Sequence, residues 1–214
     1  MSRLLVIFDL DGTLVDSEVL CNQAFLDLLP ALTDTVEELV ERYKGRKLAE
    51  ILDDIELRTS TSLPAGFEQK YRQRVADLFA TELRPVDGVP AMLEAIDQTF
   101  CIASSGPLEK IKHALTVAGL ASFIGERTFS SYSIGSWKPA PDLFLHAAEA
   151  MGFSPEHCVV VEDSPVGLEA AAAAGMLALH FVPRIHTPKC INTFSRMSEL
   201  PSILQCVERT ILKH

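Results

Sequence analysis

The stretch LLVIFDLDGTLV, residues 4–15, decides the fold that we predict for this chain. Residues 4–8 are apolar without interruption, as expected of a strand covered on both faces of a parallel sheet. Asp9 and Asp11 follow directly, and their spacing lets both side chains project to the same side as the strand ends. Gly12 then permits a turn that a Cβ atom would hinder. Taken alone, this stretch fits a carboxylate site and an Asp-rich turn equally well.

Further short apolar runs alternate with amphipathic stretches along most of the chain. This alternation predicts a doubly wound, Rossmann-like α/β fold with a parallel sheet. The last predicted helix has Ser164 as its N-cap, Pro165 at its first position and Gly175 as its stop. Besides residues 4–8, strands are expected at 100–103, 127–129, 158–161 and 177–182, and helices at about 88–98, 107–119, 142–152 and 164–174.

The segment from 16 to 83 interrupts this alternation with a run of helical patterns. They lie at roughly 17–29, 33–43, 47–58 and 65–82, and no strand pattern separates them. We therefore expect an α/β core domain, 1–15 and 84–214, and an inserted α-helical cap domain, 16–83. The borders at Asp16-Ser17 and 84–90 are the expected hinges between the two.

A second group of polar residues follows the second predicted strand. Ser104, Ser105 and Gly106 lie directly before a helix that is expected to begin at Pro107. The free backbone N–H groups of a helix start, with a serine hydroxyl beside them, can bind a phosphate group. The alternative is that the two serines are ordinary N-caps.

Two more carboxylates, Glu162 and Asp163, follow the fourth predicted strand. The carboxyl ends of parallel strands meet at one edge of the sheet, where ligands bind. Asp9 and Asp11 are therefore expected nearby, and four acids at one place require a cation. Oxygen ligands alone favour Mg²⁺, which also binds phosphate, whereas zinc would require histidine or cysteine.

Lys138 lies in a loop bounded by prolines, in the stretch WKPAPD of residues 137–142. As an isolated residue it would be interpreted as a solvated surface charge. Beside four carboxylates and a phosphate site, we expect it to compensate charge.

These four motifs, in this order, resemble those of the haloacid-dehalogenase-like hydrolases. The resemblance covers essentially the whole chain, and the helical insert looks like the α-helical cap of that family. It implies a Mg²⁺-dependent phosphatase that forms an aspartyl-phosphate and acts on a small phosphorylated metabolite. The motifs are Asp9-Leu10-Asp11-Gly12-Thr13, Ser104-Ser105-Gly106, Lys138-Pro139-Ala140-Pro141 and Glu162-Asp163.

The resemblance also implies a role for each motif residue. Asp9 would be the nucleophile, and Asp11 the general acid and then the base that activates water. Ser104 and Lys138 would hold the phosphoryl oxygens in the transition state. The metal ligands would be Asp9, the backbone carbonyl of Asp11 and Asp163, with Glu162 acting through a bound water.

A cluster of cations around a glycine stands between the second and third helical patterns of the cap segment. Lys44, Gly45, Arg46 and Lys47 form either a solvated turn with Gly45 as the helix stop, or a loop whose cations contact the substrate. The resemblance implies that this loop faces the active site. Ser105 and Gly106 are further candidates for substrate binding.

Within the family, the residues around these motifs are most similar to those of members that act on 6-phosphogluconate. They are Lys44-Gly45 with Lys47-Leu48, Ser105-Gly106-Pro107, Phe129-Ser130 with Tyr132 and Ile134, and Trp137-Lys138-Pro139. The first expected substrate is therefore 6-phosphogluconate. A phosphosugar mutase of the β-phosphoglucomutase type and a catalytically silent phosphosugar-binding protein remain alternatives.

The composition limits the partners that the chain is expected to have. Its 214 residues carry 19 basic and 29 acidic side chains, so that the net charge is 19 − 29 = −10. This charge disfavours nucleic acid and anionic membranes as partners. The sequence shows no long apolar run, so we expect a cytoplasmic protein. Five scattered cysteines indicate reduced thiols. The oligomeric state is open, and a monomer is compatible with the sequence.

Overall fold

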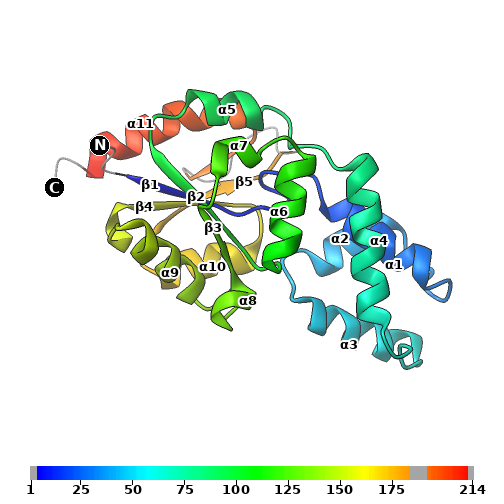
Figure 1. Cartoon of the computed structure of the whole chain (residues 1–214). Helices are drawn as coiled ribbons and strands as arrows, with labels where there is room; N and C mark the ends of the chain where they lie inside the picture. The colour runs from blue at the N-terminus through cyan, green and yellow to red at the C-terminus, as the bar shows by residue number, and fades with distance from the viewer. Residues whose placement is uncertain (1–3, 184–191, 212–214) are drawn as a thin grey trace.

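One parallel β-sheet forms the centre of the computed structural model, which describes residues 4–183 and 192–211 (Figure 1). Its strand order is β3-β2-β1-β4-β5-β6, and all neighbouring strands are parallel. The order reverses between β1 and β4, which is the doubly wound arrangement, so the predicted α/β fold is confirmed. The strands are β1 (Leu5–Phe8), β2 (Thr99–Ser104), β3 (Thr128–Ser130), β4 (Cys158–Glu162), β5 (Leu177–Phe181) and β6 (Thr193–Phe194).

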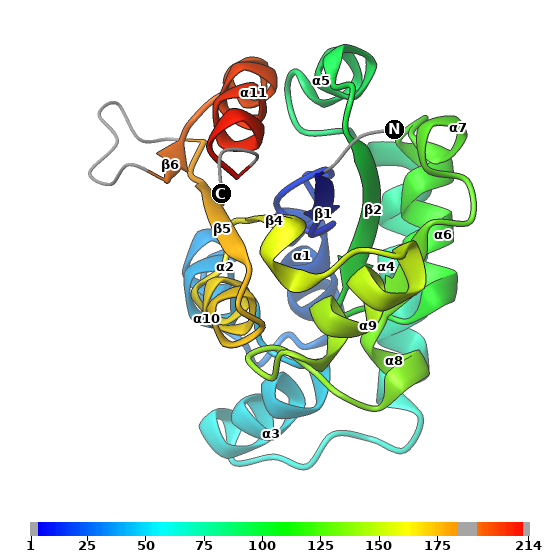
Figure 2. The ribbon, with the colours of Figure 1, turned by 90° about the vertical axis from the view of Figure 1, so that its left-hand side faces the viewer.

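Strand β1 is buried on both faces, which explains its uninterrupted apolar sequence. Val6 and Phe8 belong to one apolar core and Leu5 and Ile7 to another, on opposite faces of the sheet. Helices α9 and α10 cover the Leu5 face, and α5, α6 and α11 cover the other (Figure 2). These helices are α5 (Val89–Ala95), α6 (Leu108–Val117), α9 (Asp142–Met151), α10 (Pro165–Ala173) and α11 (Leu200–Ile211).

The predicted helical insert is present between β1 and β2 and lies beside the sheet domain (Figure 1). Its centre is aromatic: Phe25 stacks on Tyr71 with ring centroids 4.2 Å apart and meets Tyr43 edge-on at 6.3 Å. These rings belong to the same apolar core as Val6 and Phe8, so the packing of the insert is continuous with that of the sheet domain. Its helices are α1 (Glu18–Leu28), α2 (Val36–Tyr43), α3 (Leu48–Thr59) and α4 (Phe67–Glu82).

Two chain segments connect the insert to the sheet domain, and they run side by side. The backbone N–H of Asp16 donates to the Arg84 carbonyl at 3.0 Å, and that of Val86 donates to the Leu14 carbonyl at 3.0 Å. Val15 and Pro85 form an antiparallel bridge between them. The exact domain boundaries and the hinge at these segments stay predictions.

Several short elements differ from the prediction. Strand β6 comprises two residues, too few for any periodicity to reveal. Pro107 is the N-cap of α6, so this helix begins one residue later than expected. Ser164 and Pro165 occupy their predicted places at the start of α10. The remaining short helices are α7 (Ala121–Ile124), α8 (Ser131–Ile134), η1 (Pro155–His157) and η2 (Met197–Glu199).

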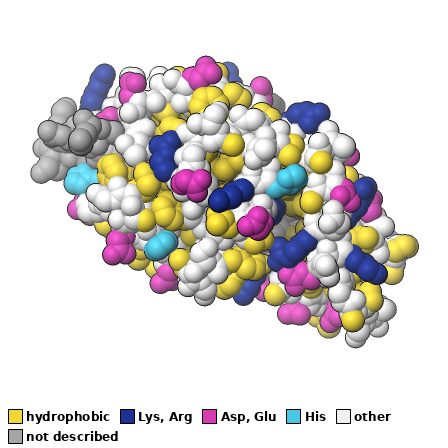
Figure 3. Space-filling model, in the orientation of Figure 1, with side chains coloured by type: hydrophobic (Ala, Val, Ile, Leu, Met, Phe, Trp, Pro, Cys, Tyr) yellow, Lys and Arg dark blue, Asp and Glu magenta, His cyan; other side chains and the backbone are white. Residues whose placement is uncertain are grey.

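The composition bears on three features of the structure: the charged side chains, the apolar character of the helices and the cysteines. Acidic and basic side chains are interspersed on the face drawn in Figure 3. Among the described residues, no helix has the length and apolar character needed to cross a membrane. Cys21, Cys101, Cys158 and Cys206 are free thiols, and Cys190 lies outside the described residues.

Candidate active site

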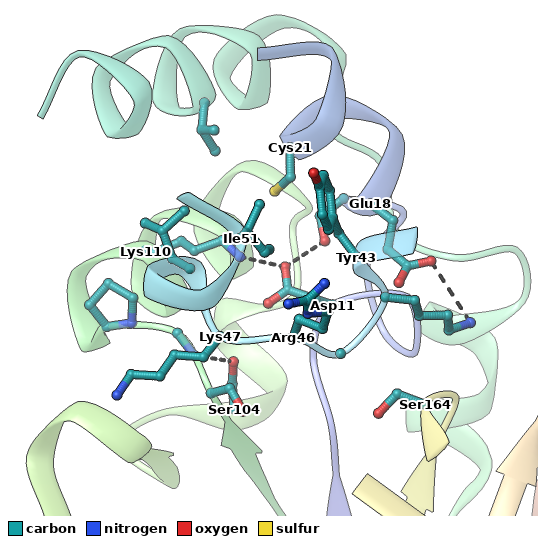
Figure 4. Close-up of a pocket in the computed structure, with 18 of the residues that line it drawn as sticks. Asp11, Glu18, Cys21, Tyr43, Arg46, Lys47, Ile51, Ser104, Lys110 and Ser164 are labelled. Atoms are coloured by element: carbon teal, nitrogen blue, oxygen red, sulfur yellow. Dashed lines mark hydrogen bonds and ion pairs between the residues drawn. The ribbon is translucent and has the colours of Figure 1, made fainter. Parts of the chain in front are cut away.

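A cavity of about 520 Å³ lies between the helical insert and the carboxyl ends of β1, β2 and β4. It brings together every site residue predicted from the sequence (Figure 4). From the sheet domain it is lined by Asp9, Asp11, Ser104, Ser105, Gly106, Lys110, His113, Tyr132, Trp137, Lys138, Glu162, Asp163 and Ser164, and from the insert by Glu18, Cys21, Phe25, Tyr43, Lys44, Gly45, Arg46, Lys47, Leu48, Ile51, Tyr71, Arg72, Val75 and Phe79, among others.

Three buried carboxylates form the floor of this cavity. One oxygen of each of Asp9, Glu162 and Asp163 lies within 4.8 Å of the others. Burial raises the pKa of Asp9 well above its usual range and also raises the pKa of Asp163, and the neighbouring Glu162 adds to both rises. A buried acidic group of this kind requires a positive charge to stay ionised. An all-oxygen donor set therefore fits a hard divalent cation here.

Lys138 supplies one of the positive charges at this floor. Its ammonium donates to Asp9 Oδ1 at 2.5 Å and to Glu162 Oε1 at 2.8 Å. The other oxygen of Glu162 accepts the backbone N–H of Ser164 at 2.6 Å. Against the lowering effect of burial, Asp9 and Glu162 raise the pKa of Lys138, so this residue stays cationic. The expected charge compensation is thus present, although 129 positions separate Lys138 from Asp9.

Asp11 lies apart from the three clustered acids. Its Oδ1 atom accepts hydrogen bonds from Lys110 Nζ at 2.7 Å and from Ser17 Oγ at 2.5 Å (Figure 4). Burial alone would raise the pKa of Asp11, but Lys110 and Ser17 together hold it below its ordinary value. The two aspartates of one short motif therefore have opposite electrostatic surroundings.

Gly12 brings the turn after β1 close to the acidic cluster. Its φ is +79°, a conformation that favours glycine, and an added Cβ atom would collide with Asp163 Oδ2 and its carboxyl carbon. Thr13 Oγ1 donates to Asp163 Oδ1 at 3.3 Å from the same turn. The glycine is thus needed both for its backbone angle and for the space beside Asp163.

The loop after β2 leads into the N-terminus of α6. Ser104 is buried, and its Oγ accepts the backbone N–H of Gly106 at 3.1 Å. Pro107 caps α6 without a side-chain hydrogen bond, so neither serine is its N-cap. No side-chain cap occupies the backbone N–H groups of the first turn of α6, which lies at the cavity, as an anion site requires.

The basic loop of the insert reaches the sheet domain. Lys44 Nζ lies 2.6 Å from Asp163 Oδ2 and 3.8 Å from Glu18 Oε2. Gly45 has φ +73°, and an added Cβ atom would meet Val166 Cγ2 at 2.8 Å and Ser164 Cβ at 2.9 Å. Gly45 is thus both the stop after α2 and the point at which the insert rests on the start of α10.

The other two cations of this loop have partners at the rim of the cavity. Arg46 lies over the Tyr43 ring at 5.7 Å and 3.9 Å from Glu50 Oε2. The ammonium of Lys47 lies 3.8 Å from the centre of the Trp137 ring. Both side chains line the cavity.

Four charged residues that line the cavity were not singled out from the sequence: Glu18, Lys110, Arg72 and Glu109. Glu18 lies beside Lys44, and burial together with Asp163 raises its pKa to about 7. Lys110 contacts Asp11 from the third position of α6. A signal for Lys110 was present in the sequence, since a cation in the first turn of a helix opposes the helix dipole.

Comparisons with known proteins agree with this geometry. A family model described as haloacid dehalogenase-like hydrolase matches residues 4–175. The 6-phosphogluconate phosphatase of Escherichia coli K12 is 39% identical over 213 residues, which cover 95% of this chain and 96% of that protein. Hexitol phosphatase A of the same organism is 26% identical over 95% of this chain and 91% of its own length.

A solved structure is similar as well. The crystal structure of a conserved haloacid dehalogenase-like protein from Agrobacterium tumefaciens strain C58 superposes with a TM-score of 0.82 at 34% identity. The match covers 94% of this chain and 97% of the other.

Proposed function

We propose, since this chain belongs to the haloacid dehalogenase-like hydrolases, that it is a Mg²⁺-dependent phosphatase of small sugar phosphates. The observation that carries this proposal is the meeting of the buried acidic cluster, which includes Asp9, with the start of helix α6 at one cavity. These parts supply a nucleophile, a place for a cation and a place for the phosphate. The first substrate that we propose is 6-phosphogluconate.

Asp9 is the proposed nucleophile. Lys138 binds its Oδ1 atom, so we assign Oδ2 as the oxygen that attacks phosphorus in line with the leaving group. The P–O bond to the leaving group breaks as the bond to Asp9 forms, which yields an aspartyl-phosphate. Water then attacks this phosphorus, releases inorganic phosphate and restores the carboxylate.

Asp11 is the proposed proton carrier in both steps. Lys110 and Ser17 both bind its Oδ1 atom, so Oδ2 is the oxygen that exchanges the proton. These donors keep Asp11 ionised in the resting site, as a base for the second step must be. The negative phosphate of a bound substrate favours its protonated form, as the acid role in the first step requires.

Asp9, Asp163 and the backbone carbonyl of Asp11 are the ligands that we propose for Mg²⁺, with Glu162 acting through water. When bound, the cation would neutralise the acidic floor and the negative phosphate above it. Ser104, Lys138 and the start of α6 bind the remaining phosphoryl oxygens in this proposal, next to Ser105 and Gly106.

Residues 16–83 are the proposed cap domain over a core of 1–15 and 84–214. Its basic loop, Lys44 to Lys47, lines the same cavity as the proposed phosphate site and would contact the anionic body of the substrate. Closure of the cap would exclude bulk water during the first step. This arrangement supports a sugar acid as the leaving group.

A panel assay tests the proposal. Release of inorganic phosphate is measured for 6-phosphogluconate, hexitol phosphates, glucose phosphates and p-nitrophenyl phosphate, with Mg²⁺ and with a chelator. We expect Mg²⁺-dependent release, fastest for 6-phosphogluconate. A mutase would instead isomerise a sugar phosphate in the presence of a bisphosphate and release little phosphate. A silent binding protein would release none, even from the aryl ester.

A further inference from the structure

Lys110 is placed where a cation is unfavourable for the fold. It is the third residue of α6, in the first turn of the helix, where the partial charge of the backbone is positive. Its side chain folds back over the phosphate loop, since a Cβ atom on Gly106 would lie 3.4 Å from Lys110 Cδ. The residue therefore brings a positive charge into the cavity and lowers the stability of the helix.

The ammonium of Lys110 has hydrogen-bonding capacity to spare. Within the described part of the chain, its hydrogen-bond acceptor is Asp11 Oδ1, whereas an ammonium carries three N–H donors. The Phe79 ring also lies near this ammonium, with its centre 5.8 Å away. Figure 4 shows Lys110 directed toward Asp11 at the cavity. Unpaired donors of a charged group beside apolar side chains favour a ligand that brings oxygen acceptors.

The other cations nearest the floor are engaged elsewhere. Lys138 binds Asp9 and Glu162, and Lys44 binds Asp163. Lys110 is the cation paired with Asp11, the residue that meets the ester oxygen in the proposed function. The atoms of a substrate nearest to Lys110 are thus those on the carbons next to the ester oxygen.

We propose that Lys110 is a specificity-determining residue, which binds an oxygen substituent on the leaving group close to the ester carbon. In this proposal Asp11 meets the ester oxygen of the substrate. The free N–H donors of Lys110 bind a hydroxyl or carboxylate oxygen next to it. The ligand class is phosphate monoesters of polyols and sugar acids, as opposed to simple alkyl phosphates. This inference rests on the proposed function.

Two esters with the same carbon chain test it. Glycerol 3-phosphate carries a hydroxyl next to the ester carbon, and propyl phosphate carries none. We expect the wild-type kcat/KM to favour glycerol 3-phosphate by at least tenfold. Lys110→Met removes a partner of Asp11 and should therefore slow the hydrolysis of both esters. The loss should be larger on glycerol 3-phosphate, because only this ester also loses a hydrogen bond to a charged group, so the preference should fall to less than about threefold.

The matched control is Lys112→Met, a half-exposed lysine of the same helix, which should keep the wild-type preference. Lys110→Gln, neutral but polar, takes the place of Lys110→Met if that variant does not fold, and should lose the preference likewise. An unchanged preference in the Lys110 variants, or an equal loss on both esters, overturns the inference and leaves the phosphatase proposal intact. If the wild type hydrolyses neither ester nor any member of the panel, the proposed function fails instead.

Discussion

At the scale of single residues, burial and charge decide what each carboxylate of the site does. Asp9 lies in the acidic cluster and its pKa is raised by burial, whereas Asp11 is held ionised by Lys110 and Ser17. Only two positions separate these aspartates in the chain. Different partners thus give one short motif a metal-binding nucleophile and a proton carrier in our proposal.

Glu18 provides a pH-dependence prediction at this scale. Burial and the nearby Asp163 raise its pKa to about 7, so the folded state binds this proton more tightly than the unfolded state. The stability that this group contributes is full below its unfolded pKa and is lost as the pH rises through 7. The free energy of unfolding of the metal-free Glu18→Gln variant should therefore fall less between pH 5 and pH 8 than that of the metal-free wild type.

Urea unfolding at four pH values in that range, in the presence of a chelator, measures this difference. Glu149→Gln, an exposed position on α9, is the control and should follow the wild type. Parallel curves for Glu18→Gln and the wild type would contradict the assignment.

At the scale of elements, the contact between the basic loop and α10 carries a second prediction. Gly45 and Gly66 share a left-handed backbone, with φ +73° and +77°, but an added Cβ atom meets Val166 and Ser164 only at Gly45. Alanine at either position should cost about 1 kcal/mol of folding free energy through backbone strain. Only Gly45→Ala should also lower kcat/KM, by at least tenfold, because the loop can no longer rest on α10.

The two variants are compared by urea unfolding and by phosphate release under the same conditions. Equal activities in Gly45→Ala and Gly66→Ala would show that the seating of this loop does not matter for turnover.

The elements of the sheet domain and the insert were largely predictable, because their signals are local. The apolar run of residues 4–8, the N-cap Ser164 and the stop at Gly175 each depend on neighbours in the sequence. Strand β6 was not predicted, since two residues leave no pattern. The strand-end rule also placed Asp9 and Glu162 at one edge, where the structure has them.

The pairings between distant charges were not predictable in the same way. The contacts of Lys44 with Asp163 and of Lys110 with Asp11 depend on how the insert and α6 are placed over the sheet. Composition and periodicity carry no information about such distances. Lys110 was missed for this reason, although its place in the first turn of α6 was itself unusual.

At the scale of the whole molecule, a net charge of −10 is combined with a cavity that gathers cations around buried acids. A divalent cation that binds the folded state alone stabilises it by mass action, by about 2.7 kcal/mol at a hundred times the dissociation constant. For a chain of this size, that free energy corresponds to a rise in Tm of several degrees.

We therefore expect Mg²⁺ to raise the Tm of the wild type at pH 7. Asp163→Asn should lose most of this shift, and Asp53→Asn, an exposed position on α3, should retain it. Thermal unfolding followed by circular dichroism, with Mg²⁺ and with a chelator, gives the comparison. A shift of equal size in Asp163→Asn would place the cation elsewhere on the molecule.

The central claim is that this cavity hydrolyses a phosphate ester through Asp9. The most direct test compares phosphate release from 6-phosphogluconate by the wild type and by Asp9→Asn, with Mg²⁺ supplied and folding verified by thermal unfolding. We predict Mg²⁺-dependent release by the wild type and a loss of at least a thousandfold in kcat for Asp9→Asn. Release by a folded Asp9→Asn variant at a rate near that of the wild type would contradict the claim.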